Sequence, residues 1–178
     1  MSKEWDILKP DYDTSGIRKL GEVKHDILLQ SLSKHIENLS EIKKEVGLKI
    51  VGHEEIIGDL RYSGYNPKSY SQNDFTNWVK DTEEVQKIAQ QYNIGATGRV
   101  RLFLLTPGTN YNMHGDQDFY RIHIPLITND ESFLIVDNRL WHLECGYIYW
   151  VKVRDKHTAI NAGKTNRIHL VFDNCEEL

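Results

Sequence analysis

The sequence predicts a mainly β protein, a jelly roll or double-stranded β-helix with flanking N-terminal helices, and two observations carry this prediction. From Gly98 onward, short apolar runs with strand periodicity are separated by residues that favour turns. Before Gly98, apolar residues recur twice at helical spacing, so two helices precede the strands. Short antiparallel strands in this number, joined by turns, are typical of a jelly roll.

The segment before the strands is expected to begin irregularly and then form the first helix. Residues 1–20 lack periodicity and contain Pro10 and Gly16, which indicates a lead-in with one short edge strand. A helix is predicted over residues 22–46, with a break near residues 38–40. Its apolar face consists of Leu29, Leu32, Ile36, Leu39 and Ile42.

A second helix is predicted to begin near Asp81, because Asp81 and Glu84 have the spacing of a capping box. Val85, Ile88, Ala89 and Tyr92 then form one apolar face, and Asn93-Ile94-Gly95 ends the helix. Between the two helices, tyrosine rings either line a pocket mouth or simply cover the core. These tyrosines are Tyr62, Tyr65 and Tyr70.

The strands are predicted in the second half of the chain. An Asp137-Asn138 turn between two of them indicates a hairpin. Arg121 and His123 lie two positions apart on one strand, so their side chains share a face. A loop is expected to lead to His157. The strand ranges are 100–104, 120–126, 133–136, 140–143, 147–153 and 167–172.

Length and composition limit the classes of function. The 178 residues suit one domain, in which residues 1–95 give helical support and lead-in strands and residues 96–178 form the jelly-roll core with the candidate site. A net charge of −4 provides no basic field for phosphates, so nucleic acid is not an expected partner. No apolar leader or membrane-length segment is present, which predicts a cytoplasmic protein and no membrane partner. Cys145 and Cys175 are expected to be free thiols.

Three residues form a candidate metal site. Two imidazoles and one carboxylate are the ligand set that binds a non-haem Fe(II) on one face and leaves the other face open. His114 and Asp116 differ by two positions, so on extended backbone both project to the same side. His157 would have to arrive from another strand. The spacing leaves a second interpretation open, in which all three are unrelated polar residues in surface loops.

Arg167 opens the last predicted strand, shortly after His157. A planar guanidinium binds a carboxylate through two parallel hydrogen bonds. A co-substrate with two carboxylates could therefore bind the metal at one end and Arg167 at the other.

The chain resembles Fe(II)- and 2-oxoglutarate-dependent oxygenases of the aspartyl/asparaginyl β-hydroxylase family, whose relatives include bacterial hydroxylases of free amino acids such as proline. The resemblance covers Arg99 to Asp173, and the order and spacing of its motifs are more specific than any one of them. The motifs are Thr106-Pro107-Gly108-Thr109, His114-x-Asp116, Arg121-x-His123-x-Pro125-Leu126, Gly146, His157 with Asn161, and Arg167-x-His169-Leu170-x-x-Asp173.

The resemblance implies a cupin-like jelly roll and a site for Fe(II), 2-oxoglutarate and O₂. His114, Asp116 and His157 would be the metal ligands and the catalytic centre. Arg167 would bind the far carboxylate of 2-oxoglutarate, and Arg121 and His123 would line the same pocket. The implied reaction converts 2-oxoglutarate to succinate and carbon dioxide and hydroxylates a substrate carbon.

The substrate is expected to be a small molecule, such as a free amino acid or its derivative. The peptidyl aspartyl hydroxylases of animals have two histidine ligands and no carboxylate, whereas this chain has Asp116. The alternatives are hydroxylation of Asp or Asn side chains in a protein or peptide, and a non-enzymatic cupin-like protein that binds a metal or ligand. The candidates for substrate contacts, by position alone, are Arg101, Tyr111, Asn112 and Trp150.

Overall fold

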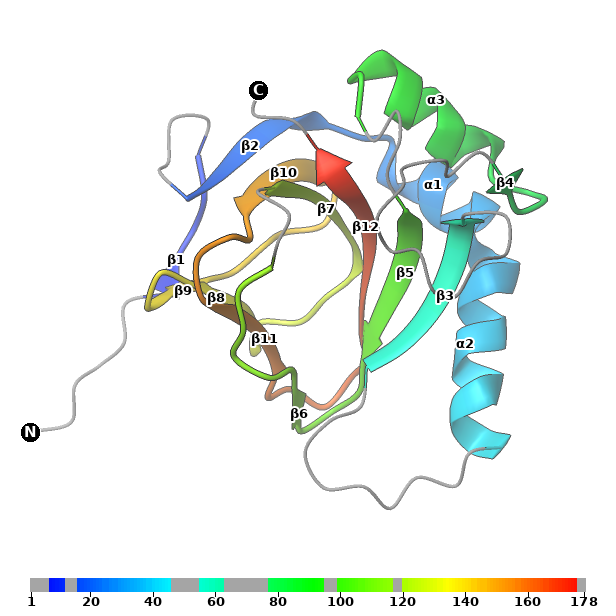
Figure 1. Cartoon of the computed structure of the whole chain (residues 1–178). Coiled ribbons are helices and arrows are strands. Elements are labelled where there is room, and N and C mark those ends of the chain that lie inside the picture. The colour runs from blue at the N-terminus through cyan, green and yellow to red at the C-terminus, as the bar shows by residue number, and fades with distance from the viewer. Residues whose placement is uncertain are drawn as a thin grey trace, which may run out of the picture.

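Two β-sheets face one another in the computed structural model, and the helices cover one of them (Figure 1). The predicted mainly β jelly roll is therefore confirmed. No helix among the described residues is long and apolar enough to cross a membrane. The structure describes residues 7–11, 16–45, 55–62, 77–94, 99–116 and 120–175.

The larger sheet has seven strands in the order β2-β10-β7-β12-β5-β3-β4, and every neighbouring pair in it is antiparallel. Its central strand is β12, the last strand in the sequence. The strands are β2 (Ile17–Glu22), β10 (Tyr147–Lys152), β7 (Tyr120–Ile127), β12 (Arg167–Cys175), β5 (Val100–Leu105), β3 (Glu55–Tyr62) and β4 (Asn77–Trp78).

The smaller sheet has five strands in the order β1-β9-β8-β11-β6. Asp137 and Asn138 both have positive φ, 51° and 58°, which confirms the tight turn between β8 and β9. The strands are β1 (Ile7–Leu8), β9 (Arg139–Trp141), β8 (Ser132–Val136), β11 (His157–Asn161) and β6 (Thr109–Asn110).

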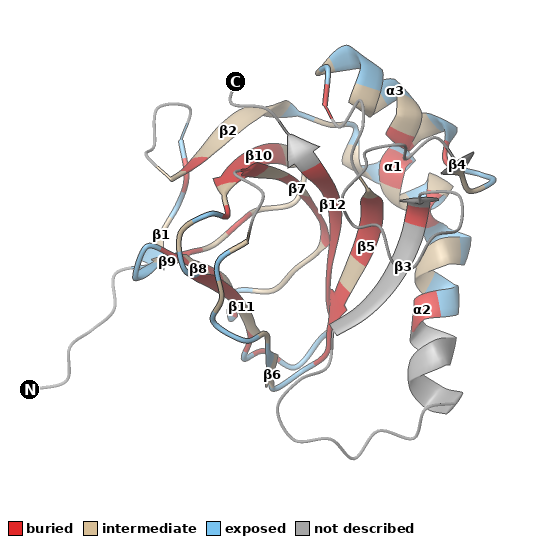
Figure 2. Cartoon of the chain, viewed as in Figure 1, coloured by how far each residue is buried: buried red, intermediate tan, exposed pale blue. Residues whose placement is uncertain are grey.

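The pleat of β5, β7 and β12 separates an apolar face from a polar one. Buried residues are concentrated in these strands and in β10 (Figure 2). One face packs against the helices, and burying each of its apolar side chains stabilises the fold by about 1.5–3 kcal/mol. It consists of Val100, Leu102, Leu104, Ile122, Ile124, Ile168, Leu170 and Phe172. Alternate residues, such as Arg101, Arg121 and Arg167, line a cavity on the other face.

The first predicted helix is two helices, α1 (His25–Ser31) and α2 (Ser33–Glu45). The break falls at Leu32 and not near residues 38–40, so that prediction is wrong in position. Leu28 and Leu32 are both buried against the sheet, and the change of direction at Leu32 lets α2 continue along β3. Core packing determines this break, and no glycine or proline marks it in the sequence.

The helix α3 spans Glu83–Gln91, and its predicted capping box is wrong. Asp81 has a φ of 61° and lies outside the helix, while Thr82 is the N-cap residue and makes no side-chain cap hydrogen bond. The Thr82 hydroxyl instead donates to the Val79 carbonyl at 2.7 Å. The end of the helix was predicted correctly, since Asn93 adopts a φ of 49°.

Four strands, β3, β4, β6 and β11, lie outside the predicted strand ranges. The backbone of β11 is paired between β8 and β6, and β3 pairs with β5 far along the sequence. The lead-in also forms a six-residue strand, β2, beside β10. Cys145 is a free, half-buried thiol, and burial raises its pKa. The side chains of Tyr62 and Cys175, and all of Tyr65 and Tyr70, lie outside the described residues.

Asn161 holds the two sheets together at one end of the cavity. It lies on β11 and is fully buried. Its amide nitrogen donates to the carbonyl of Leu105, on the other sheet, and to that of Thr165. Its side-chain oxygen accepts from Asn129, Ser132 and the Gly163 amide.

We expect Asn161→Ala to lower the free energy of unfolding by about 2–4 kcal/mol, because several buried partners lose their hydrogen bonds at once. Urea denaturation measures the change. Asn110→Ala, which removes an exposed amide from the neighbouring strand β6, should change it by less than about 0.5 kcal/mol. Equal effects of the two substitutions would contradict the role of Asn161.

Candidate metal centre

Most of the predicted site residues line one cavity of about 160 Å³ between the two sheets. Polar side chains come mainly from β5, β7 and β12 on one wall, and from β11 and the segment after β6 on the other. The lining consists of Arg101, Phe103, Leu105, Tyr111, His114, Asp116, Arg121, His123, Leu134, His157, Ala159, Arg167, His169 and Val171.

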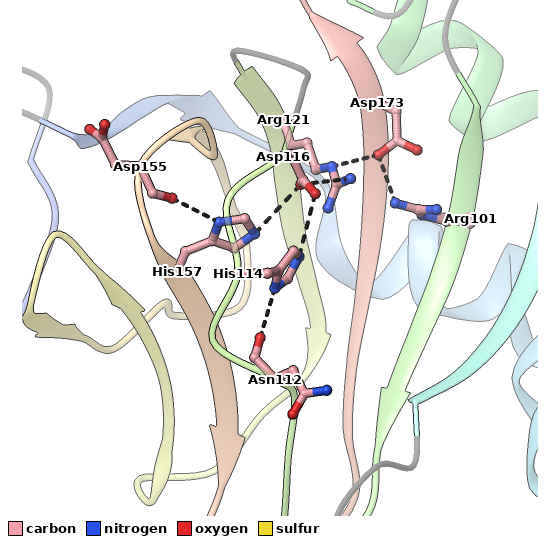
Figure 3. A network of polar contacts seen from close by, with 8 residues as sticks. All are labelled: Arg101, Asn112, His114, Asp116, Arg121, Asp155, His157 and Asp173. Carbon is pink, nitrogen blue, oxygen red and sulfur yellow. Dashed lines mark hydrogen bonds and ion pairs between the residues drawn. The ribbon is translucent and has the colours of Figure 1, made fainter. Parts of the chain in front are cut away.

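Backbone pairing brings the three candidate ligands together. His114 and His157 form an antiparallel bridge, with N–O distances of 3.1 and 2.8 Å between their main chains. The Asp116 amide donates to the Val153 carbonyl at 3.1 Å, which ties the segment of the first two ligands to the end of β10. One ligand atom from each of the three side chains lies within 4.8 Å of the others (Figure 3).

Hydrogen bonds to backbone carbonyls set the tautomer of both histidines. His114 Nδ1 lies 2.7 Å from the Asn112 oxygen, and His157 Nδ1 lies 3.1 Å from the Asp155 oxygen. Because a carbonyl only accepts, each Nδ1 carries the proton, and each Nε2 of a neutral ring presents a lone pair. Burial lowers the pKa of His157, against the opposing effect of its carbonyl partner, and so favours the neutral ring.

The donor set fits a divalent cation. The Nε2 atoms of His114 and His157 lie 3.4 and 3.6 Å from the two oxygens of Asp116, with lone pairs directed at one another. Asp116 Oδ2 is also buried and accepts no well-aligned hydrogen bond from the described residues, although an arginine nitrogen lies near it. A cation between the three groups would relieve this repulsion. Two histidines and one carboxylate with open positions are the ligand set of non-haem Fe(II).

Gly115, between two ligands, is required by close backbone approach. A Cβ added there would lie 2.8 Å from the Arg154 carbonyl oxygen, closer than such contacts allow. Any side chain would therefore push the segment with His114 and Asp116 away from β11. The glycine is part of the reason that the two ligands reach His157.

Arg167 and two histidines form a second polar group in the cavity. Arg167 is buried, and its Nη2 donates to His169 Nδ1 at 3.1 Å. His123 Nδ1 lies 3.4 Å from the same nitrogen. Burial, and next the charge of Arg167, hold the pKa of both histidines well below the usual value, so both rings are neutral at pH 7. His123 is enclosed by protein but keeps some accessible surface, because it faces the cavity.

Arg121 and Arg101 are engaged by protein carboxylates. Arg121 Nη2 lies 2.8 Å from Asp116 Oδ2, and Arg121 Nε lies 2.9 Å from Asp173 Oδ1. Arg101 Nη2 donates to the same Asp173 oxygen at 3.0 Å. The sequence reasoning gave Asp173 no role of its own, although the two-residue period from Arg167 already placed it on the cavity face of β12.

The four candidate substrate residues are not all at the cavity. Arg101 and Tyr111 line it, and Tyr111 packs edge-on against His114. Asn112 contributes its carbonyl to His114, while its own side chain is exposed. Trp150 is on the opposite face of the sheet, within the core under the helices, so its prediction as a substrate contact is not supported. Side chains alternate between the two faces of a strand. Because Tyr149 and Val151 face the smaller sheet, Trp150 between them faces the helices.

A sequence model of the aspartyl/asparaginyl β-hydroxylase family matches residues 65–176, which include every candidate ligand. The chain belongs to this family. The protein is therefore an enzyme of the oxygenase class, and the non-enzymatic alternative is excluded. A search of curated proteins found no match.

Similar solved structures have the same fold at low sequence identity. A prolyl-4-hydroxylase from Pseudomonas putida aligns with a TM-score of 0.60 and 13% identity, over 93% of this chain and 96% of its own. AviO1 from Streptomyces viridochromogenes gives 0.56 and 15%, over 90% of each chain. A viral collagen prolyl hydroxylase from Paramecium Bursaria Chlorella virus-1, solved with 2OG, gives 0.55 and 12%, over 91% and 97%.

We expect His114→Ala, Asp116→Ala and His157→Ala each to lose most of the affinity for Fe(II) or its substitute Mn(II), because each removes one of three ligands. Calorimetric titration under anaerobic conditions measures the affinity, and circular dichroism should show an intact fold. His35→Ala removes a histidine from α2, away from the cavity, and serves as the control. Metal affinity near that of the unmodified protein in any of the three ligand variants would contradict the assignment.

Proposed function

We propose that the protein is an Fe(II)- and 2-oxoglutarate-dependent dioxygenase that hydroxylates a small substrate, a free amino acid or its derivative. One observation carries the proposal: the same cavity contains both a two-histidine, one-carboxylate centre and the buried guanidinium of Arg167. A small dicarboxylate can bind to both groups at once. Family membership supports the reaction class, and the substrate class is the proposed part.

His114, Asp116 and His157 would hold the metal from one side. Bound Fe(II), with 2-oxoglutarate and O₂, supplies oxidative decarboxylation to succinate and carbon dioxide, coupled to insertion of one oxygen atom into a substrate C–H bond. The apolar residues Phe103 and Leu134 also line the cavity. Asp116 also argues against halogenation, in which a small residue must free that coordination position for chloride.

Arg167 would bind the carboxylate of 2-oxoglutarate that is distant from the metal. Its hydrogen bond to His169 Nδ1 fixes the plane of the guanidinium, and a neutral His169 accepts this bond without adding charge. Burial strengthens a charge-assisted hydrogen bond there, because little water competes. His123 lines the same part of the cavity.

The preference for a small substrate rests on Asp116. The cavity volume of about 160 Å³ accommodates a small co-substrate and the reacting end of a substrate. The sequence suggested Arg101 as the partner of a substrate carboxylate. Its ion pair with Asp173 reduces the positive charge available for that role.

The substrate class can be tested with the purified protein, Fe(II), ascorbate and 2-oxoglutarate, given each common amino acid in turn. We expect one or a few amino acids to stimulate succinate release and to yield a product heavier by one oxygen atom. The Asp116→Ala variant provides the blank. If no amino acid reacts while a peptide library yields products, the alternative of Asp or Asn side-chain hydroxylation replaces the proposal.

Arg167→Lys should weaken binding of 2-oxoglutarate, since lysine keeps the charge but loses the planar pair of donors. We expect a loss of about 1–3 kcal/mol, or a rise of about 5- to 150-fold in the apparent KM for 2-oxoglutarate. Steady-state succinate production measures it. Arg139→Lys, at an exposed position in the β8–β9 hairpin, should leave KM unchanged. An unchanged KM in Arg167→Lys would indicate that another residue of the cavity binds the distant carboxylate of 2-oxoglutarate.

A further inference from the structure

Four charged side chains form a continuous row that ends at the candidate metal centre (Figure 3). Their order is Arg101, Asp173, Arg121 and Asp116, so the charges alternate in sign. The successive N–O distances are 3.0, 2.9 and 2.8 Å. All four come from different segments, namely β5, β12, β7 and the loop after β6.

The row is largely shielded from water. The side chains of Asp173 and Arg101 are each 9% exposed, and those of Arg121 and Asp116 are 15% and 16% exposed. In such surroundings, removal of one charge leaves its neighbour without compensation. Each member therefore constrains the position of the next.

Asp116 is the member with the least support from its own backbone. It lies outside the regular strands, and its amide makes one main-chain hydrogen bond, to Val153. Arg121 and Asp173, by contrast, lie on neighbouring strands of the larger sheet. The backbone of Asp173 is held by a hydrogen bond to Arg99, and the β7–β12 register shifts between Phe172 and Cys175. Asp173 projects to the same face of β12 as Arg167 and His169, where it meets Arg121.

We propose that Arg121 and Asp173 are positioning residues for the metal ligand Asp116, and that Asp173 acts through Arg121. The guanidinium lies between two carboxylates and forms an ion pair with each, which couples the position of Asp116 to that of Asp173. Arg121 thereby orients a metal ligand, a different role from the co-substrate contact that the sequence suggested. The inference rests on the proposed metal site.

A simple charge effect and a positioning effect predict opposite results for Arg121. Removing a positive charge close to a divalent cation should tighten metal binding if only Coulomb attraction and repulsion matter. If Arg121 orients Asp116, its removal should weaken metal binding instead. Groups that support ligands in this way typically contribute about 10- to 100-fold to metal affinity.

The experiment is a titration of the metal-free, full-length protein with Mn(II), followed by calorimetry. We expect Arg121→Gln and Asp173→Asn each to weaken Mn(II) binding by about 10- to 100-fold. The double variant should be no weaker than Arg121→Gln alone, because Asp173 acts only through Arg121. Asp130→Asn, which removes an exposed carboxylate, should change the affinity less than threefold.

Arg121→Lys provides a second test that keeps the charge. Lysine cannot bridge two carboxylates as a planar fork does, so Mn(II) affinity should fall although the net charge is unchanged. The visible absorption of bound Co(II) should also change, because it reports ligand geometry directly. Thermal unfolding of each metal-free variant identifies any that fails to fold. If Arg121→Gln fails to fold, the Mn(II) affinity of Arg121→Lys tests the proposal in its place.

Tighter or unchanged Mn(II) binding in Arg121→Gln, or an unaltered Co(II) spectrum in Arg121→Lys, would overturn the inference. Additive losses in the double variant would overturn the action of Asp173 through Arg121. These results are distinct from failure of the proposed metal site, in which the unmodified protein itself would bind neither metal, and they do not depend on which substrate class reacts. The inference requires that the unmodified protein binds Mn(II) tightly and that the variants of Arg121 and Asp173, but not Asp130→Asn, lose Mn(II) affinity.

Discussion

The alternation of side chains along β5, β7 and β12 is the constraint on which the rest of the structure depends. Each strand must bury one set of residues under the helices, and the pleat then forces the intervening set into the space between the sheets. That second set contains Arg101, Arg121 and Arg167, whose charges would be unfavourable in an ordinary core. The chain accommodates them with Asp173, with the neutral ring of His169 and with the cavity itself.

The metal centre adds a separate requirement, because its ligands come from the opposite wall. His114 and His157 face each other across a single antiparallel bridge, and both rings are oriented by carbonyls of nearby residues. These hydrogen bonds leave the Nε2 atoms as ligands before any ion binds. The arrangement is thus prepared for a cation by the backbone, and the larger sheet completes it by holding the carboxylate of Asp116 through Arg121.

The sequence was sufficient for the fold class, which follows from local period, and for most of the residues that meet in the cavity, which came mainly from the family resemblance because spacing alone left the metal site open. It was insufficient where tertiary contacts decide. The break at Leu32 carries no helix-breaking residue, and the short β11 forms because β8 and β6 flank it. Trp150 was misplaced because a position near the site in sequence says nothing about which face of a strand it occupies. The pairing of Arg101 with Asp173 joins residues on two strands, which no motif spacing could specify.

The central place of β12 has a consequence for how the protein folds during synthesis. The larger sheet has the order β7-β12-β5 at its middle, yet β12 is the last of these strands to leave the ribosome. Until β12 emerges, β5 and β7 lack the strand that pairs with both of them. Their apolar faces therefore cannot form one continuous surface. Pairings so distant in sequence are slow to form, and exposed strand edges favour aggregation. A nascent chain that stalls before Arg167 would therefore expose two open sheet edges and would depend on chaperones.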